Sequence, residues 1–160
     1  MSEITVAWLI RHTETNCNPN VWCTNIRDIQ LTDNGKQRAI DIAEKVTRRP
    51  DLIITSPFLR SIDTAKPLHN KWPDVPCEQW SIQEFIYLSP GKYATKTIID
   101  RNNAKKEYWQ HASPTFCDGE DAESFLDFTG RLKSFHKQLL AQKGFVVVFG
   151  HGLFLKAFLL

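Results

Sequence analysis

The sequence predicts an α/β fold, a three-layer α/β/α sandwich with a mostly parallel central sheet. Apolar runs typical of strands alternate with segments of helical periodicity. The clearest runs are residues 4–10, 52–55 and 145–149. Each run leads to an arginine or a histidine within a few residues, so parallel pairing would gather basic side chains at one edge of the sheet.

Composition and length indicate one soluble domain, residues 1–160. The chain is 42% hydrophobic and 24% charged, with a formal net charge of +2. This charge is too small for a general nucleic-acid surface, so we expect no nucleic-acid partner. No apolar run approaches the roughly 18 residues of a membrane span, and the start Met-Ser-Glu lacks the features of a secretory signal. We therefore expect a cytoplasmic protein without a membrane partner.

The four cysteines, at positions 17, 23, 77 and 117, form no CxxC pair. Neither a zinc site nor a thioredoxin-like redox pair is indicated. For a cytoplasmic protein, reduced thiols are the expected state.

In the first half of the chain, each of the first two strand-like runs is followed by a predicted helix. One helix begins after the capping residue Thr32 and closes before Pro50. The other follows Ser56 and Pro57, which read as an N-cap and a first helical residue. Arg60 then lies on the first turn of this helix.

In the second half, residues 77–82 predict a short strand and residues 83–91 a loop. A helix is expected within 93–109, and 111–119 reads as irregular. Phenylalanines and leucines repeat at steps of three and four through residues 120–142, which predicts a long helix with this stripe in the core. Gly144 follows where a left-handed cap is needed.

The residues at the strand ends predict a phosphate pocket. If their strands are neighbours, Arg11, His12, Arg60 and His151 meet at one edge of the sheet. Two guanidinium groups can bind a tetrahedral dianion through charge-assisted hydrogen bonds. Helix N-termini after Ser56 and Gly152 are expected to add backbone N–H donors.

Simpler interpretations exist for the same residues. A histidine at a strand end is often a core residue satisfied by backbone hydrogen bonds. Arg60 could be a surface residue paired with Asp63 or Asp33. Two arginines beside a core would be costly without an anion, which favours the phosphate pocket.

The whole pattern resembles the histidine phosphatase superfamily, in the branch that includes the cofactor-dependent phosphoglycerate mutases. The matching segments follow in order along the chain: RHTETNCN at 11–18, DIQLTDNGKQRA at 28–39, TSPFLRSIDTA at 55–65, QEF at 83–85, ESFLDFTGRL at 123–132 and FGHG at 149–152. The resemblance implies a phosphoglycerate mutase-like fold and phosphoryl chemistry that needs neither a metal nor a cofactor.

The resemblance also implies roles for single residues. His12 matches the nucleophile, and Glu84 falls where many members carry the general acid. The residues that match phosphate or substrate contacts are Arg11, Asn18, Thr24 and Arg60. His151 also matches a phosphate contact and is predicted to be catalytic. Glu14 is expected to orient the loop. Asp118 and Glu120 remain alternatives to Glu84, since a loop carboxylate is usually just solvated.

Three features depart from the family pattern. Thr13 stands where a small residue is usual, which predicts a narrower pocket and, together with the short C-terminal end, suggests a noncatalytic protein. Trp22 and Asn25 replace an Arg and a Gly of the mutases, and the mutase insertion is missing, which favours transfer to water. We expect a phosphatase that acts on a small phosphorylated substrate. Mutase activity, or a noncatalytic phosphate-binding or scaffold protein, remains an alternative.

The apolar end at residues 158–160 has two interpretations. Members of the family commonly continue past the segment that matches FGHG. The end therefore predicts either a contact in a homodimer or a shortened fold.

Overall fold

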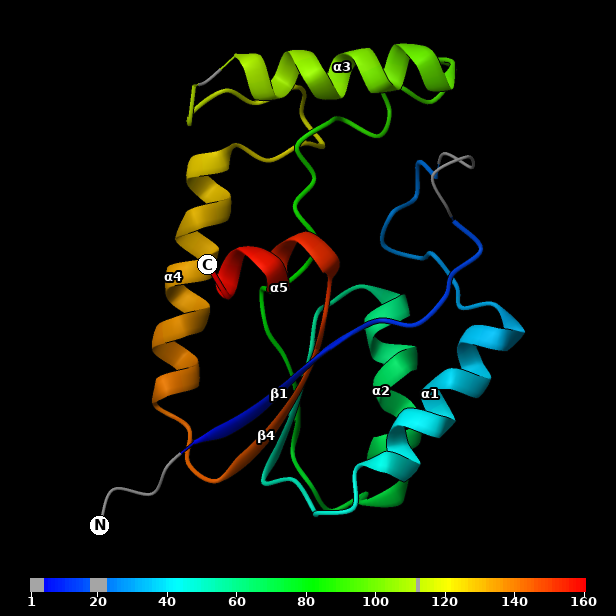
Figure 1. The fold of residues 1–160 in the computed structure, drawn as a ribbon, viewed down its shortest axis with the longest axis vertical. Coiled ribbons are helices and arrows are strands. Elements are labelled where there is room, and N and C mark those ends of the chain that lie inside the picture. The colour runs from blue at the N-terminus through cyan, green and yellow to red at the C-terminus, as the bar shows by residue number, and fades with distance from the viewer. Residues whose placement is uncertain (1–4, 18–22, 112) are drawn as a thin grey trace.

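The structure, a computed structural model, describes residues 5–17, 23–111 and 113–160 of the chain. Strands and helices alternate along it, as the sequence predicts, except that two helices follow one another before the last strand (Figure 1). The elements in order are β1 (Val6–Arg11), α1 (Asp33–Lys45), β2 (Leu52–Thr55), α2 (Leu59–Lys71), β3 (Cys77–Gln79), α3 (Ile98–Gln110), α4 (Phe125–Leu140), β4 (Phe145–Gly150) and α5 (Gly152–Phe158).

The four strands form one parallel sheet in the order β1-β4-β2-β3. Helices α1 and α2 cover one face of this sheet, and α4 and α5 cover the other (Figure 1). Side chains of β4 alternate between the two cores: Val146 and Val148 pack on the α4 and α5 side, and Val147 and Phe149 on the α1 and α2 side. The predicted three-layer sandwich is confirmed.

Strand β1 is less buried than its apolar sequence predicts. It pairs with β4 alone and forms an edge of the sheet within the described residues. Val6 and Trp8 keep 43% and 45% of their surface exposed. By contrast, every residue of β2 and β4 is buried. The apolar runs therefore predicted the strands, but not which of them lies at the edge.

Helix α1 begins as predicted, with the Thr32 side chain accepting a hydrogen bond from the backbone N–H of Gly35. The helix start packs tightly against the loop after β1, since a Cβ at Gly35 would collide with the backbone carbonyl of Glu14. The carboxylate of Glu14 accepts hydrogen bonds from Thr32 and Asn34. These bonds lower the pKa of Glu14. Glu14 thus fixes the loop to α1, in agreement with its expected role.

Helix α2 begins later than predicted. Phe58, not Ser56, precedes its first residue, Leu59, and no side chain caps it. The Ser56 hydroxyl bonds instead to the Phe58 N–H and to the ring of His151. A side chain committed to a tertiary partner cannot also cap the helix. Arg60 still lies on the first turn.

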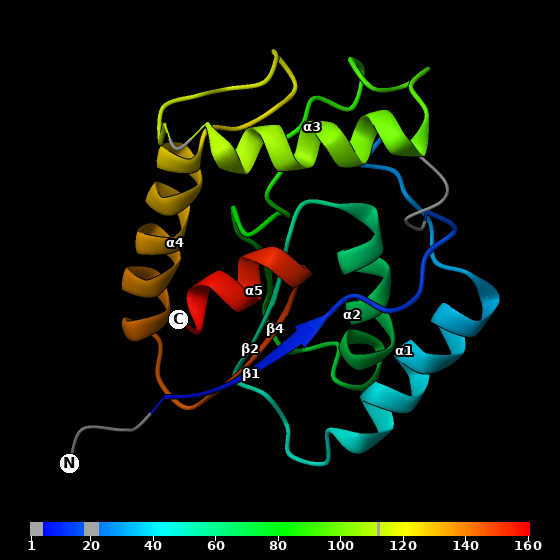
Figure 2. The same ribbon diagram turned by 45° about the horizontal axis from the view of Figure 1, so that its top comes forward.

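The long helix α4 is shorter than predicted. Glu123 pairs with Arg131, and the Ser124 side chain caps the helix start. Phe128 and Phe135 lie in the core as expected, but Phe125 on the first turn is 40% exposed. Helix α3 lies across the top of the molecule, beyond the strands (Figures 1 and 2).

Gly144 adopts φ +80° in the turn from α4 to β4, as predicted. Within the described residues, no helix is long and apolar enough to cross a membrane.

Candidate active site

The register of β1 and β4 brings two histidines together. Arg11 is aligned with Gly150, and the His12 N–H donates to the Gly150 carbonyl over 3.0 Å. His12 and His151 therefore leave two neighbouring parallel strands at the same edge of the sheet. Their ring centroids are 5.2 Å apart. The predicted meeting of these two side chains is confirmed.

His12 presents an unprotonated ring nitrogen. Its Nδ1 lies 2.8 Å from the backbone carbonyl of Thr13, an acceptor, so Nδ1 carries the proton and Nε2 keeps a lone pair. The pKa of His12 is lowered to about 4, mainly by burial and to a smaller extent by the charges of Arg60 and Arg11, against the raising effect of the Thr13 bond. The ring is therefore neutral at physiological pH.

His151 is fully buried and also neutral. Its Nε2 lies 2.6 Å from the Ser56 hydroxyl. Burial lowers its pKa to about 2, helped by the charges of Arg60, His12 and Arg11. Its buried Nδ1 has no hydrogen-bond partner in the described part of the chain. A buried polar atom without a partner is costly unless a ligand satisfies it.

Two guanidinium groups accompany the histidines. Arg60 is only 6% exposed, and burial lowers its pKa to about 10, so it stays charged at neutral pH. Its Nη1 donates to the Ile26 carbonyl over 2.6 Å. Arg60 is thus not the surface ion-pair residue of the alternative interpretation. Arg11 ends β1 and lies beside Gly152, with Nε 3.5 Å from where a Cβ of that glycine would be.

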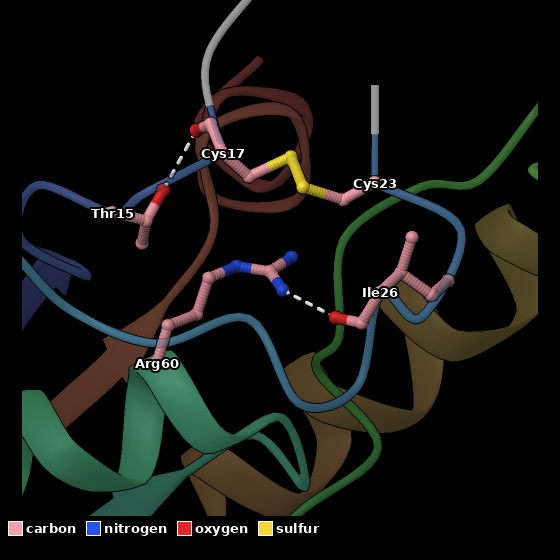
Figure 3. The surroundings of a disulfide bond; sticks show 5 residues. All are labelled: Thr15, Cys17, Cys23, Ile26 and Arg60. Atoms are coloured by element: carbon pink, nitrogen blue, oxygen red, sulfur yellow. Dashed lines mark hydrogen bonds between the residues drawn. A yellow bond between two sulfur atoms is a disulfide. The ribbon is translucent and has the colours of Figure 1, made fainter. Parts of the chain in front are cut away.

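The loop over Arg60 contains a disulfide between Cys17 and Cys23 (Figure 3). This corrects the expectation that all four cysteines are reduced; Cys77 and Cys117 are free thiols. The two bonded residues are six apart in sequence, with Cα atoms 6.1 Å apart. The prediction considered only CxxC pairs, and a pair six residues apart has no such motif. Whether Cys17 and Cys23 can bond depends on the path of the loop between them.

Glu84 reaches the same place from the loop after β3. Its Oε1 accepts hydrogen bonds from the N–H groups of Leu153 and Phe154 at the start of α5. Its Oε2 lies 3.6 Å from where a Cβ of Gly152 would be, beside Arg11. These contacts correct one expectation: two of the first amides of α5 bind Glu84, so they are not donors for a phosphate.

The two alternative acids differ in position. Asp118 accepts from Lys92 and from the Ser89 N–H, which fixes it outside the lining of the cavity described next. Glu120 lines the same cavity as Glu84. Glu84 is the carboxylate that touches the start of α5, next to His151.

Cavities lie on both sides of these groups. One, of about 710 Å³, is lined by Arg11 and His12 and extends along α1. The other, of about 460 Å³, is lined by Glu84, Phe58 and the loop residues Thr24 to Arg27. Thr24 and Glu84 therefore line the same cavity, and the role of Thr24 as a substrate contact stays a prediction. Asn18 and Trp22 lie outside the described residues, so the predictions for them stay predictions.

Thr13 lines the cavity along α1 and contacts α2. Its N–H and hydroxyl both approach the Thr64 hydroxyl, at 3.1 and 3.4 Å, and Thr64 in turn donates to the Arg60 carbonyl. Because the Thr64 proton is used there, Thr13 is the donor in the contact between hydroxyls. The Thr13 side chain is thus held against α2.

Sequence reasoning missed three contributors to this site. Ser56 reads as a helix cap, Thr64 as one more residue of a helix, and the Ile26 carbonyl has no side-chain signal at all. The position of Ser56 directly after a strand could have indicated a functional role. No three His, Cys, Asp or Glu residues of the described segments cluster closely enough to hold a metal ion.

Comparisons with known proteins agree with the geometry. A family model described as "Histidine phosphatase superfamily (branch 1)" matches residues 7–160. No curated protein gives a significant sequence match. Among solved structures, YhfR from Bacillus stearothermophilus is 23% identical, with a TM-score of 0.75 over 98% of this chain and 78% of its own.

Two enzymes have similar structures. The alpha-ribazole phosphatase from Shigella flexneri is 22% identical, with a TM-score of 0.71 over 93% of this chain and 75% of its own. Phosphoserine phosphatase from Entamoeba histolytica, in complex with 3-phosphoglyceric acid, is 24% identical, with a TM-score of 0.71 over 96% of this chain and 77% of its own. At these identities the structures establish a shared fold.

Proposed function

Because the chain belongs to the histidine phosphatase superfamily, branch 1, we propose that it is a metal-independent phosphatase that hydrolyses a small phosphomonoester through a phosphohistidine on His12. One observation carries the proposal. A neutral His12 with a free Nε2 lies 5.2 Å, between ring centroids, from a neutral His151 whose buried Nδ1 has no partner in the described residues. A phosphoryl group bound between the rings would accept a hydrogen bond from the His151 Nδ1 and present its phosphorus to the lone pair of the His12 Nε2.

In the first step the His12 Nε2 attacks phosphorus and the bond to the ester oxygen breaks. Arg11, Arg60 and the His151 Nδ1–H hold the non-bridging oxygens, where negative charge is spread in the transition state. Glu84, in its protonated form, gives its proton to the leaving oxygen. The products are an alcohol and phosphohistidine.

In the second step the Glu84 carboxylate takes a proton from water as that water attacks phosphorus. The P–N bond breaks, which releases inorganic phosphate and restores neutral His12. Two guanidinium groups supply the charge that a metal ion supplies in other phosphatases. We propose Asn18 and Thr24 as further contacts, to the phosphate and to the rest of the substrate.

Transfer to water is favoured over a mutase reaction. The cavity beside Glu84 is lined by four carboxylates, Glu84, Glu120, Asp121 and Glu123, and by one arginine, Arg27. A phosphoglycerate would place its own carboxylate against these groups. The contacts of Thr13 with Thr64 support a catalytic interpretation, because they direct the Thr13 side chain to α2.

Turnover of p-nitrophenyl phosphate in the presence of EDTA tests the proposal. We expect activity in the natural protein, none in His12→Ala, and unchanged activity in His136→Ala, a control at an exposed position of α4. Acid quenching during turnover should trap an acid-labile phosphoryl group on His12. Activity that survives in His12→Ala would contradict the proposal, and phosphate binding without turnover would indicate a scaffold.

A further inference from the structure

Neutral His151 has two possible tautomers, and its contact with Ser56 distinguishes between them. The Ser56 hydroxyl, fully buried, lies 2.6 Å from the His151 Nε2 and accepts a hydrogen bond from the Phe58 N–H over 3.2 Å. Either ring nitrogen of a neutral histidine can carry the proton. Which one does so decides whether His151 offers the substrate a donor or a lone pair.

Counting donors and acceptors settles the choice. If Nε2 carried the proton, the Ser56 oxygen would accept two hydrogen bonds, and its own proton would have no acceptor among the contacts of the described residues. The lone pair of Nδ1 would then face the substrate anion. If Ser56 donates to Nε2, both groups are satisfied and Nδ1 carries an N–H.

We propose that Ser56 is a positioning residue of this active site: its hydroxyl donates to the His151 Nε2 and thereby holds the ring as a neutral Nδ1–H donor for a phosphoryl oxygen. The inference rests on the proposed function for its catalytic meaning. The tautomer itself is a property of the free protein. The backbone supports this geometry, because the Ser56 N–H lies 3.3 Å from the Phe149 carbonyl and so ties Ser56 to the strand that carries His151.

The chain offers a matched control. Ser61 is also fully buried, and its hydroxyl donates to the Phe149 carbonyl and accepts from the Ser56 N–H. It has backbone partners only. Ser61→Ala therefore removes a nearby buried hydroxyl of the same kind without touching the ring of His151.

The experiment reads the tautomer by long-range ¹⁵N–¹H correlation on protein labelled in histidine. In the natural protein we expect His151 to show a protonated Nδ1 and an unprotonated Nε2. Ser56→Ala should lose this pattern, while Ser56→Thr, which restores a hydroxyl, and Ser61→Ala should keep it. The affinity for inorganic phosphate, measured in the same spectra, should fall by at least about tenfold in Ser56→Ala alone.

Kinetics separate a positioning role from a structural one. We expect kcat/KM for p-nitrophenyl phosphate to fall by at least about tenfold in Ser56→Ala and to recover in Ser56→Thr. Equal losses in Ser56→Ala and Ser61→Ala with an unchanged tautomer would overturn the proposal. So would a protonated Nε2 in the natural protein, a result that needs no variant to fold. If the natural protein shows no turnover, the proposed function fails, while the tautomer and the phosphate affinity still decide the role of Ser56.

Discussion

At the scale of single residues, the two histidines have different roles because their partners differ. The Thr13 carbonyl is a pure acceptor, so it leaves His12 with a free lone pair on Nε2. The Ser56 hydroxyl can donate, so it leaves His151 with a free N–H on Nδ1. Two identical side chains 5.2 Å apart thus suit different tasks, a nucleophile and a donor in the proposed reaction.

We expect both rings to stay neutral well below the ordinary pKa of histidine. NMR titration should find His12 unchanged from pH 8 to about 5, with a midpoint near 4, because burial and two guanidinium groups oppose its charged form. Added inorganic phosphate should raise this midpoint, since an anion favours the protonated ring. A midpoint at 6 or above in the free protein would contradict the geometry.

The lowered pKa of His12 also makes the free energy of unfolding depend on pH. The unfolded chain takes up a proton at His12 near pH 6.5, and the folded protein does so only near pH 4. Between these values the unfolded state binds more protons, so the free energy of unfolding falls as the pH is lowered from about 6.5 to 4. Below pH 4 this group has no further effect.

The sequence predicted which basic side chains form the site, but it did not predict the hydrogen bonds between them and their neighbours. Arg11, His12 and His151 follow apolar runs, so parallel pairing alone was enough to bring them together. Ser56 looks like a helix cap in sequence, because the competing partner, His151, is 95 residues away. The Glu84 contacts with α5 likewise depend on a loop whose path has no local signal.

At the scale of elements, two glycines differ in whether the backbone requires them: Gly144 is required by its turn, and Gly130 is not required by its helix. Gly144 has φ +80°, and a Cβ there would collide with the Asp51 carboxylate. That carboxylate accepts a hydrogen bond from the Phe145 N–H at the start of β4. Gly130 lies within α4, and a Cβ there would meet open space.

Alanine substitutions at these two glycines should have opposite effects. Gly144→Ala should lower the free energy of unfolding by about 1–2 kcal/mol, because it strains the turn and displaces Asp51. Gly130→Ala should raise it by about 0.5–1 kcal/mol through helix propensity. Urea unfolding measures both, and a change of the same sign in the two variants would contradict the predicted turn.

Helix periodicity located the elements, but their starts depended on which side chain caps them. The start of α1 was predicted correctly from its local cap, Thr32. The start of α4 was predicted too early, although its cap, Ser124, is also local and accepts a hydrogen bond from the Asp127 N–H. The start of α2 was predicted too early for another reason, because Ser56 bonds to a distant partner, His151.

The disulfide fastens the loop that contacts Arg60. Thiol counting after denaturation without reductant should find two free cysteines, Cys77 and Cys117, and four after reduction. Cys17→Ser/Cys23→Ser should lower the free energy of unfolding by about 2 kcal/mol in the loop-entropy account. Cys77→Ser/Cys117→Ser is the matched control with no such loss. Four thiols before reduction would contradict the bond.

At the scale of the whole molecule, charge separates the two sides of the site. The cavity along α1 is lined by three basic residues, Arg11, Arg38 and Lys45, and by two acidic ones, Glu14 and Asp41, while the cavity beside Glu84 is lined by four carboxylates and, among basic residues of the described segments, by Arg27 alone. An in-line reaction places the leaving group opposite the nucleophile and next to the acid. The alcohol part of the substrate is therefore expected on the acidic side.

Three esters with two-carbon leaving groups test this expectation. We expect kcat/KM to fall in the order 2-aminoethyl phosphate, 2-hydroxyethyl phosphate, 2-phosphoglycolate, with roughly fivefold or more between the first and the last. Glu120→Gln should reduce the ratio of kcat/KM between 2-aminoethyl phosphate and 2-phosphoglycolate, whereas Glu107→Gln on α3 should leave it unchanged. A preference for phosphoglycolate would show that the acidic cavity does not receive the leaving group.

The strand that carries Arg11 and His12 has a hydrogen-bonded neighbour on one flank only, in the part of the chain that the structure describes. Freeing it from the sheet breaks one ladder and exposes little core, since its side chains are already half exposed. Partial fraying at this border would displace His12 while the interior, built on β2 and β4, stays folded. Catalytic competence is thus less robust than the fold itself, and rising denaturant should abolish turnover before it melts the helices.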